Sequence, residues 1–220
     1  MSFGTLLAVC RVHELRPTRD ATGVTAIDKR PVAGPVKVHR LGLSGDLQAS
    51  RKHHGGESKA VYAYSQDDAD YWAAELGTEI PPGLFGENLR ITGIPVSEAV
   101  IGERWQIGEK TVLEATCPRT PCRNFADRMQ QPRWVGRFAE AGRVGTYLRV
   151  VQMGSISAGD TVSVIHRPAH GVTSGDTFRG LSAEQIQLLT GAAASGEVKL
   201  SPEMQKMLRQ LQSRRIVASG

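Results

Sequence analysis

The sequence predicts a mostly β fold, a barrel or a sandwich, with a few helices and a small helical unit at its C-terminal end. Three observations carry this prediction. Short β-type segments separated by Gly and Pro fill residues 1–167. Helical patterning replaces them after Arg167-Pro168. Hydrophobic residues make up 40% of the 220 residues and charged residues 22%, which is an ordinary composition for a globular protein with a real core.

The predicted strands are short and lie close together in the sequence. They cover residues 36–41, 60–64, 88–91, 104–107, 111–115, 148–152 and 161–165. In 111–115, Thr-Val-Leu-Glu-Ala, apolar and polar side chains alternate, which is the two-residue period of a strand. Short strands with turn residues between them are typical of barrels and sandwiches.

Three helices are expected within this β region. Ser65 can cap the first, and Asp68 stands at the capping-box position three residues later. A second follows Cys122, passes through Met129 and is ended by Pro132. A third covers residues 134–141.

The C-terminal part reads as a small all-helical unit of about 50 residues. Ser182 begins one helix, with Gln185 at the capping-box position. Ser201-Pro202 begins another, since Pro is tolerated at the first helical position. A weaker helix is expected over residues 173–181.

Charge and hydropathy narrow the function classes. The net charge of +5 and the pI of about 9.3 suit anionic partners, but a solvated basic surface explains most of these scattered charges equally well. No basic run is interleaved with aromatic residues, so we expect no specific nucleic-acid partner. No apolar run approaches the ~20 residues of a membrane span, and we identify no signal peptide. The sequence therefore predicts a cytoplasmic protein without membrane attachment.

The three cysteines, Cys10, Cys117 and Cys122, are an odd number and do not form a disulfide framework of the secreted type. At least one thiol stays free. Cys117 and Cys122 follow a predicted strand in Cys-Pro-Arg-Thr-Pro-Cys, where Arg119 and Arg123 flank them. Cationic neighbours favour the thiolate, which is both the nucleophile and the metal ligand. The spacing does not match a zinc site, so one reactive cysteine is a hypothesis that the segment alone leaves open.

A second polar cluster spans residues 45–62 and holds Asp46, His53, His54 and Lys59. It allows three interpretations: a metal site, an anion site formed by Gly55-Gly56 and Lys59, or a glycine-rich turn with surface histidines. A third segment, residues 83–89, places Asn88 beside a tight turn, where it could contact a polar ligand. A hydrolase that pairs Cys122 with His53 or His54 is a further alternative.

Three motifs in this order resemble the MOSC proteins of the hydroxylaminopurine-resistance type, MOSC being the C-terminal domain of molybdenum cofactor sulfurase. The motifs are His-Gly-Gly…Lys-Ala-Val-Tyr at 54–62, Phe-Gly-Glu-Asn-Leu at 85–89 and Pro-Arg-Thr-Pro-Cys at 118–122. The C-terminal part resembles the three-helix extension of that subgroup. The resemblance implies a distorted β-barrel over residues 1–167 and a helical extension over 168–220.

The resemblance also implies a molybdenum cofactor, a molybdopterin, held through one cysteine. Pro121-Cys122 matches that position, so Cys122 is the expected metal ligand and Cys117 is secondary. Asn88 and Asn124 are expected cofactor contacts, while charge alone selects Lys59 and Arg119 for the pterin phosphate. No pyridoxal phosphate is expected.

The implied activity is the reduction of N-hydroxylated compounds, such as hydroxylamino bases and hydroxylamines, to amines. His53 or His54 would serve as a proton donor. Three cysteines cannot hold a four-cysteine iron–sulfur cluster, so electrons would come from a partner reductase of the flavoprotein or ferredoxin type. The alternative is a carrier of the cofactor or of sulfur, with a persulfide on Cys122. The sequence leaves a homodimer and a monomer equally open.

Overall fold

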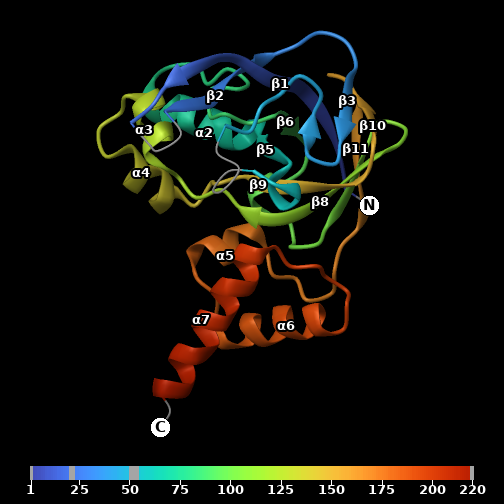
Figure 1. The fold of residues 1–220 in the computed structure, drawn as a ribbon, viewed down its shortest axis with the longest axis vertical. Helices are drawn as coiled ribbons and strands as arrows, with labels where there is room; N and C mark the ends of the chain where they lie inside the picture. The colour runs from blue at the N-terminus through green and yellow to red at the C-terminus, as the bar shows by residue number, and fades with distance from the viewer. Residues whose placement is uncertain (1, 20–22, 50–54, 219–220) are drawn as a thin grey trace.

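The computed structural model describes residues 2–19, 23–49 and 55–218. Figure 1 shows a β-rich body with the last three helices gathered on one side of it. Within the described residues, no helix combines the length and the apolar character that a bilayer crossing requires.

A closed barrel forms the body. Among the described residues, seven strands make the ring, each bonded to the next and the last returning to the first. In ring order they are β1 (Phe3–Pro17), β11 (Thr161–His166), β7 (Arg104–Ile107), β8 (Thr111–Pro118), β9 (Thr146–Gln152), β5 (Val61–Ser65) and β6 (Leu89–Thr92). Neighbours are antiparallel except β5 and β6, which are parallel. The predicted barrel is confirmed, and the sandwich alternative is wrong.

Strand β1 was not marked by the sequence pattern, although it is the longest strand. Its first half pairs with β11 and β6, and its second half pairs with β2 (Val24–Pro31) outside the ring. Register shifts interrupt these ladders between Leu6 and Ala8 and again after Val12. Such bulges break the two-residue alternation by which a strand is recognised in a sequence. A small second sheet joins β10 (Gly154–Ile156), β3 (Val36–His39) and β4 (Gly42–Leu43).

The three helices expected beside the barrel are confirmed as α2 (Gln66–Leu76), α3 (Arg123–Met129) and α4 (Trp134–Ala141). Two short 3-10 turns, η1 (Glu57–Lys59) and η2 (Val96–Glu98), complete this part. The Ser65 hydroxyl caps α2 by accepting from the Asp68 N–H at 3.0 Å. The Asp68 carboxylate does not return to the cap; it accepts from Ser97 and Arg143 at 2.7 Å each. Helix α3 ends before Pro132 because Gln130 is left-handed, with φ 51°.

Two different cores meet in the barrel wall. The barrel interior is mainly aliphatic, built on side chains such as Leu6, Val61 and Leu113. The space between the wall and helices α2, α3 and α4 is aromatic: its buried rings belong to Tyr62, Tyr64, Trp72, Phe85, Phe125, Trp134 and Phe138. Edge-to-face contacts dominate around Phe125, which lies 4.9 Å from Phe138 and 5.4 Å from Trp134 between ring centroids. This aromatic core fixes α3 against the barrel.

The C-terminal extension consists of α5 (Ser174–Arg179), α6 (Ala183–Ala194) and α7 (Pro202–Ala218), as the sequence predicts. Capping boxes begin α5 at Thr173 and α6 at Ser182. The Ser201 hydroxyl accepts from the Met204 N–H at the start of α7. Apolar side chains of α6 and α7 pack with Ile101 and Cys117 of the barrel part in one buried cluster.

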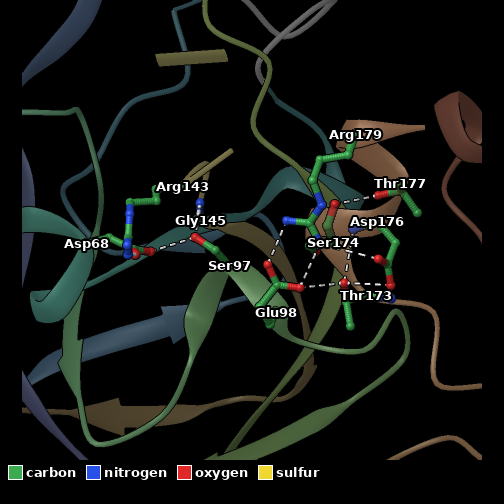
Figure 2. Close-up of polar contacts among 10 residues, drawn as sticks. All are labelled: Asp68, Ser97, Glu98, Arg143, Gly145, Thr173, Ser174, Asp176, Thr177 and Arg179. Carbon is green, nitrogen blue, oxygen red and sulfur yellow. Dashed lines mark hydrogen bonds and ion pairs between the residues drawn. The ribbon is translucent and has the colours of Figure 1, made fainter. Parts of the chain in front are cut away.

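Polar contacts also join α5 to the barrel (Figure 2). Glu98 of η2 accepts from the Thr173 hydroxyl at 2.9 Å and from the Arg179 guanidinium at 2.8 and 3.1 Å. The hydroxyl of Ser174 lies 2.7 Å from that of Thr146 on β9. The predicted domain boundary at 167/168 falls between β11 and α5 and remains a prediction. The parts before and after this boundary share a buried interface.

Candidate functional site

A cleft opens where β8 ends, between the start of α3 and strand β2. Eighteen residues line it: Val24, Thr25, Ala26, Ile27, Lys29, Asp46, Leu47, Gln48, Ala49, Lys59, Ala60, Tyr62, Gly86, Asn88, Arg119, Cys122, Asn124 and Tyr147. Five of the residues predicted to bind cofactor are among them: Lys59, Asn88, Arg119, Cys122 and Asn124. The barrel thus brings together side chains that lie far apart in the sequence. Their roles toward a ligand stay predictions.

Cys122 sits at the turn from β8 into α3. It is the residue before the first turn of α3 and has an extended backbone, with φ −130° and ψ 172°. Its side chain does not cap the helix, and the residue is half-buried at the cleft wall. Pro121, also predicted at the site, is half-buried and precedes it in the chain, where its ring restricts the backbone that presents the thiol.

The other two thiols are closed off from solvent. Burial raises the pKa of the Cys10 thiol to about 12 and that of the Cys117 thiol to about 11. Both therefore stay protonated near neutral pH, and a protonated thiol is a poor ligand and nucleophile. Of the three cysteines, all of which lie in described segments, Cys122 is the one that lines the cleft.

Arg119 supplies a fixed cation in the cleft wall. The residue is buried, and its guanidinium donates to the Phe85 carbonyl. It lies over the Phe125 ring, 3.8 Å from the centroid, and 5.1 Å from the Tyr62 centroid. Burial acts to lower its pKa, but the neighbouring Tyr62 and Tyr147 raise it overall. The flanking Arg123 is different: it is exposed and lies 4.0 Å from Asp127 on the outside of α3.

Lys59 supplies a second cation from η1. Its ammonium lies 5.8 Å from the centroid of the Tyr147 ring, and only 13% of its side chain is exposed. The ammonium also forms an ion pair, 2.9 Å long, with Glu203 in the first turn of α7. The helical extension therefore reaches the lining of the cleft, which the sequence did not indicate.

Asn88 is held by a buried polar network at the cleft floor. Its side-chain oxygen accepts from the Tyr62 N–H at 3.1 Å. Its amide nitrogen donates to the Cys10 carbonyl at 3.1 Å and to the Asp46 carboxylate at 2.8 Å. Because an amide has two N–H hydrogens, both are engaged within the protein. The predicted contact of Asn88 with a cofactor would have to use the remaining lone pair of its oxygen.

Lys29 is a cleft residue to which sequence reasoning assigned no role, and Asp46 was considered only as part of a metal-site interpretation of residues 45–62. The Lys29 ammonium pairs with Asp46, which also accepts from the backbone N–H of Val12 at 2.8 Å. Asp46 stands in the same polar segment, 45–62, as Lys59, and this shared segment could have marked Asp46 as a site residue. Lys29 lies in β2, a strand without any motif, and no signal in the sequence marked it.

The remaining predictions have mixed outcomes. The Asn124 side-chain oxygen accepts from the Thr18 hydroxyl at 2.6 Å at the edge of the cleft. His53 and His54, predicted as proton donors, lie outside the described residues. Within the described part of the chain, one cluster could hold a metal by ligand spacing, His13, Glu14 and Asp28, but the Asp28 carboxylate already accepts from Arg16 and Arg128.

The residues of the cleft suit a molybdenum–pterin cofactor by their chemistry. One half-buried thiol offers a soft ligand, and two cations, on Arg119 and Lys59, offer charge for a phosphate group. Gly86 also lines the cleft, and its φ of 78° together with the close approach of Ile27 leaves no room for a side chain there. The donor set therefore fits the cofactor implied by the sequence resemblance.

Comparison with known proteins identifies the family of the chain. Residues 50–163 match the model of the MOSC domain family. The chain is 37% identical over 147 residues to a protein named reductase from Gibberella moniliformis, a match that covers 66% of this chain and 26% of the relative. It is 31% identical over 149 residues to the uncharacterized protein YflK of Bacillus subtilis, covering 68% and 67% of the two chains.

Solved structures share the fold. The crystal structure of YiiM from Geobacillus stearothermophilus superposes with a TM-score of 0.74 at 23% identity, over 94% of this chain and 98% of that one. At that identity the likeness shows the fold, including the extension, and no more. With a family model that covers half of its residues and relatives above 30% identity, the chain belongs to the MOSC domain family.

Proposed function

We propose that this protein binds a molybdenum cofactor through Cys122 and reduces N-hydroxylated compounds to amines. One observation carries the proposal: the half-buried Cys122 thiol opens into the same cleft as the cations of Arg119 and Lys59. Family membership supports the cofactor, and the relative that carries the name reductase supports the type of reaction. The match covers only 26% of that relative, so a reductase activity is proposed for this chain and is not carried over from the name.

When bound, the cofactor supplies the two-electron redox chemistry. The protein contributes ligation, orientation and charge. Cys122 provides the thiolate ligand from a turn that Pro121 restrains. Arg119, held on the Phe125 ring, and Lys59 of η1 would neutralise the phosphate. The Lys29–Asp46 pair and Asn88 also line the cleft, where the Asn88 amide donates to the Asp46 carboxylate.

The substrate would enter over an apolar rim. Val24 and Leu47 line the cleft and are 40% and 43% exposed. A planar base or another ring-bearing hydroxylamine could cover these side chains while its N–O group points to the cleft floor. In the overall reaction the N–O bond breaks, two electrons and two protons are taken up, and the products are the amine and water. The chain has no flavin or iron–sulfur motif in its sequence, so a partner reductase would supply the electrons.

The test is metal and pterin analysis of protein made in a host that synthesises the cofactor, followed by an activity assay. Cofactor-loaded protein, a chemical reductant and a hydroxylamino purine should yield the amine. Cys122→Ala protein prepared in the same way is the control. Amine formation no higher than this control, across several N-hydroxylated substrates, would reject the reductase proposal. An added sulfur mass on Cys122 without molybdenum would favour the sulfur-carrier alternative instead.

A further inference from the structure

Glu203 of the helical extension forms an ion pair with Lys59, a residue that lines the cleft. Its carboxylate lies 2.9 Å from the Lys59 ammonium, while half of the Glu203 side chain is exposed. Burial acts to raise its pKa, but the bond from Lys59 lowers it overall, so the carboxylate is ionised near neutral pH. The pair therefore sets a negative charge directly against one of the two cations expected to bind phosphate.

A helix cap and apolar packing position Glu203 at the start of α7. Glu203 precedes Met204, whose N–H is bound by the Ser201 hydroxyl and whose side chain is buried with Leu208 against Cys117 of β8. This packing anchors the first turn of α7 to the barrel. The ion pair between Glu203 and Lys59 adds to this anchoring, so its loss should loosen the first turn of α7.

The charge balance at Lys59 has a direct consequence for anion binding. A lysine ammonium is a compact charge that attracts any anion that enters the cleft beside it. A phosphate that does so meets the repulsion of the Glu203 carboxylate a few ångströms away, in a partly buried site where screening by water is reduced. Binding of the phosphate and retention of the Lys59–Glu203 pair therefore oppose each other.

We propose that Glu203 competes with the phosphate of the cofactor for Lys59, so that docking of the first turn of α7 and loading of the cleft are negatively coupled. This inference rests on the proposed function for the identity of the phosphate. Coupling between two sites is reciprocal. Removing the carboxylate should strengthen phosphate binding, and phosphate binding should loosen the start of α7.

The experiment uses the full chain without cofactor and inorganic phosphate as the probe. Isothermal titration should give about tenfold tighter phosphate binding for Glu203→Gln, which keeps the side-chain shape and removes the charge. Glu184→Gln is the matched control, because Glu184 is an exposed glutamate on α6 that does not line the cleft. Its affinity should equal that of the wild type. In Lys59→Met protein, adding Glu203→Gln should bring no gain.

Hydrogen exchange gives the reciprocal readout. Amides in the first turn of α7 should exchange several-fold faster in wild-type protein when phosphate is added, and exchange in α6 should not change. Equal or weaker phosphate binding by Glu203→Gln, no detectable binding by it, or an equal gain in the Lys59→Met background would overturn the inference. Failure of the cofactor proposal is distinguishable: wild-type protein from a cofactor-producing host would then hold no pterin, while the phosphate results would stand.

Discussion

Cys117 and Cys122 belong to one short segment, yet they lie in opposite surroundings. Cys117, on β8, is sealed by the helices of the extension, and burial raises its pKa to about 11. Cys122, at the turn into α3, is half-buried and lines the cleft. The barrel wall thus separates a thiol that helps to hold the extension from a thiol that can meet a ligand. The difference arises because Cys117 lies within β8, whereas Cys122 lies beyond the end of that strand. Of the two arginines that flank Cys122 in the sequence, Arg119 lines the cleft and Arg123 does not.

The largest expected effect is on metal retention. Cys122→Ala should lose essentially all bound molybdenum, because no other thiol reaches the cleft among the described residues. Cys117→Ala should retain most of it and lose only about 1 kcal/mol of unfolding free energy, a common cost of a small core truncation. Metal analysis by mass spectrometry and chemical unfolding measure the two quantities. Equal loss of molybdenum in both variants would contradict the assignment of Cys122, and not Cys117, as the metal ligand.

Thiol reactivity should differ by about a hundredfold. With iodoacetamide at pH 8, native protein should be labelled at Cys122 first, since burial and raised pKa values leave Cys10 and Cys117 almost entirely as thiols. Peptide mass spectrometry after timed quenching gives the three rates. The same protein in denaturant is the control and should react at all three sites at similar rates. Native labelling of Cys117 as fast as Cys122 would contradict the comparison.

Stability should fall in alkali because of the buried thiols. A folded-state pKa above the unfolded value favours the protonated thiol, so its full contribution is present below about pH 9 and is lost as pH rises toward 11 or 12. The loss by pH 11 should be roughly 2 kcal/mol for each thiol. Urea unfolding at several pH values measures it. Cys117→Ala should show a flatter alkaline decline than the wild type; an identical decline would mean that Cys117 ionises freely in the fold.

The smallest effect tests the contact between η2 and α5. Glu98→Ala removes the acceptor for Thr173 and Arg179 and should weaken the seal over Cys117 by about 1 kcal/mol, a usual value for a partly exposed network. Labelling of Cys117 should then rise about fivefold through more frequent local opening, while labelling of Cys122 stays constant. Asp127→Ala, which removes an exposed pair on α3, is the control. No change at Cys117 would show that the seal depends on apolar packing alone.

Much of the fold followed from local signals in the sequence. The caps at Ser65, Ser182 and Ser201 and the alternation in residues 111–115 place helices and a strand where the structure has them. β1 and β2 were missed because bulges and pairing outside the ring hide their period. Local sequence signals indicate the preference of a segment for helix or strand. β1 and β2 become strands through pairing with other segments, which local signals do not reveal.

The candidate site was predicted only where its residues stand in segments with local sequence signals. Lys59, Arg119 and Cys122 stand in recognisable segments, and the structure gathers them in one cleft. The position of Lys29 in the cleft and the contact from Glu203 depend on tertiary packing between distant segments. The engagement of both Asn88 hydrogens inside the protein is likewise a property of the fold and not of its motif.

The aromatic core beside α3 has an optical consequence. The indole rings of Trp72 and Trp134 are buried, with centroids 4.6 Å apart, and Phe125 joins Trp134 to the guanidinium of Arg119 at the cleft wall. Their emission should therefore be blue-shifted and sensitive to small movements of α3. A ligand that binds against Arg119 and shifts the Phe125 ring should change the emission of this pair. Intrinsic fluorescence thus offers a label-free gauge of cleft occupancy that needs neither turnover nor a redox partner.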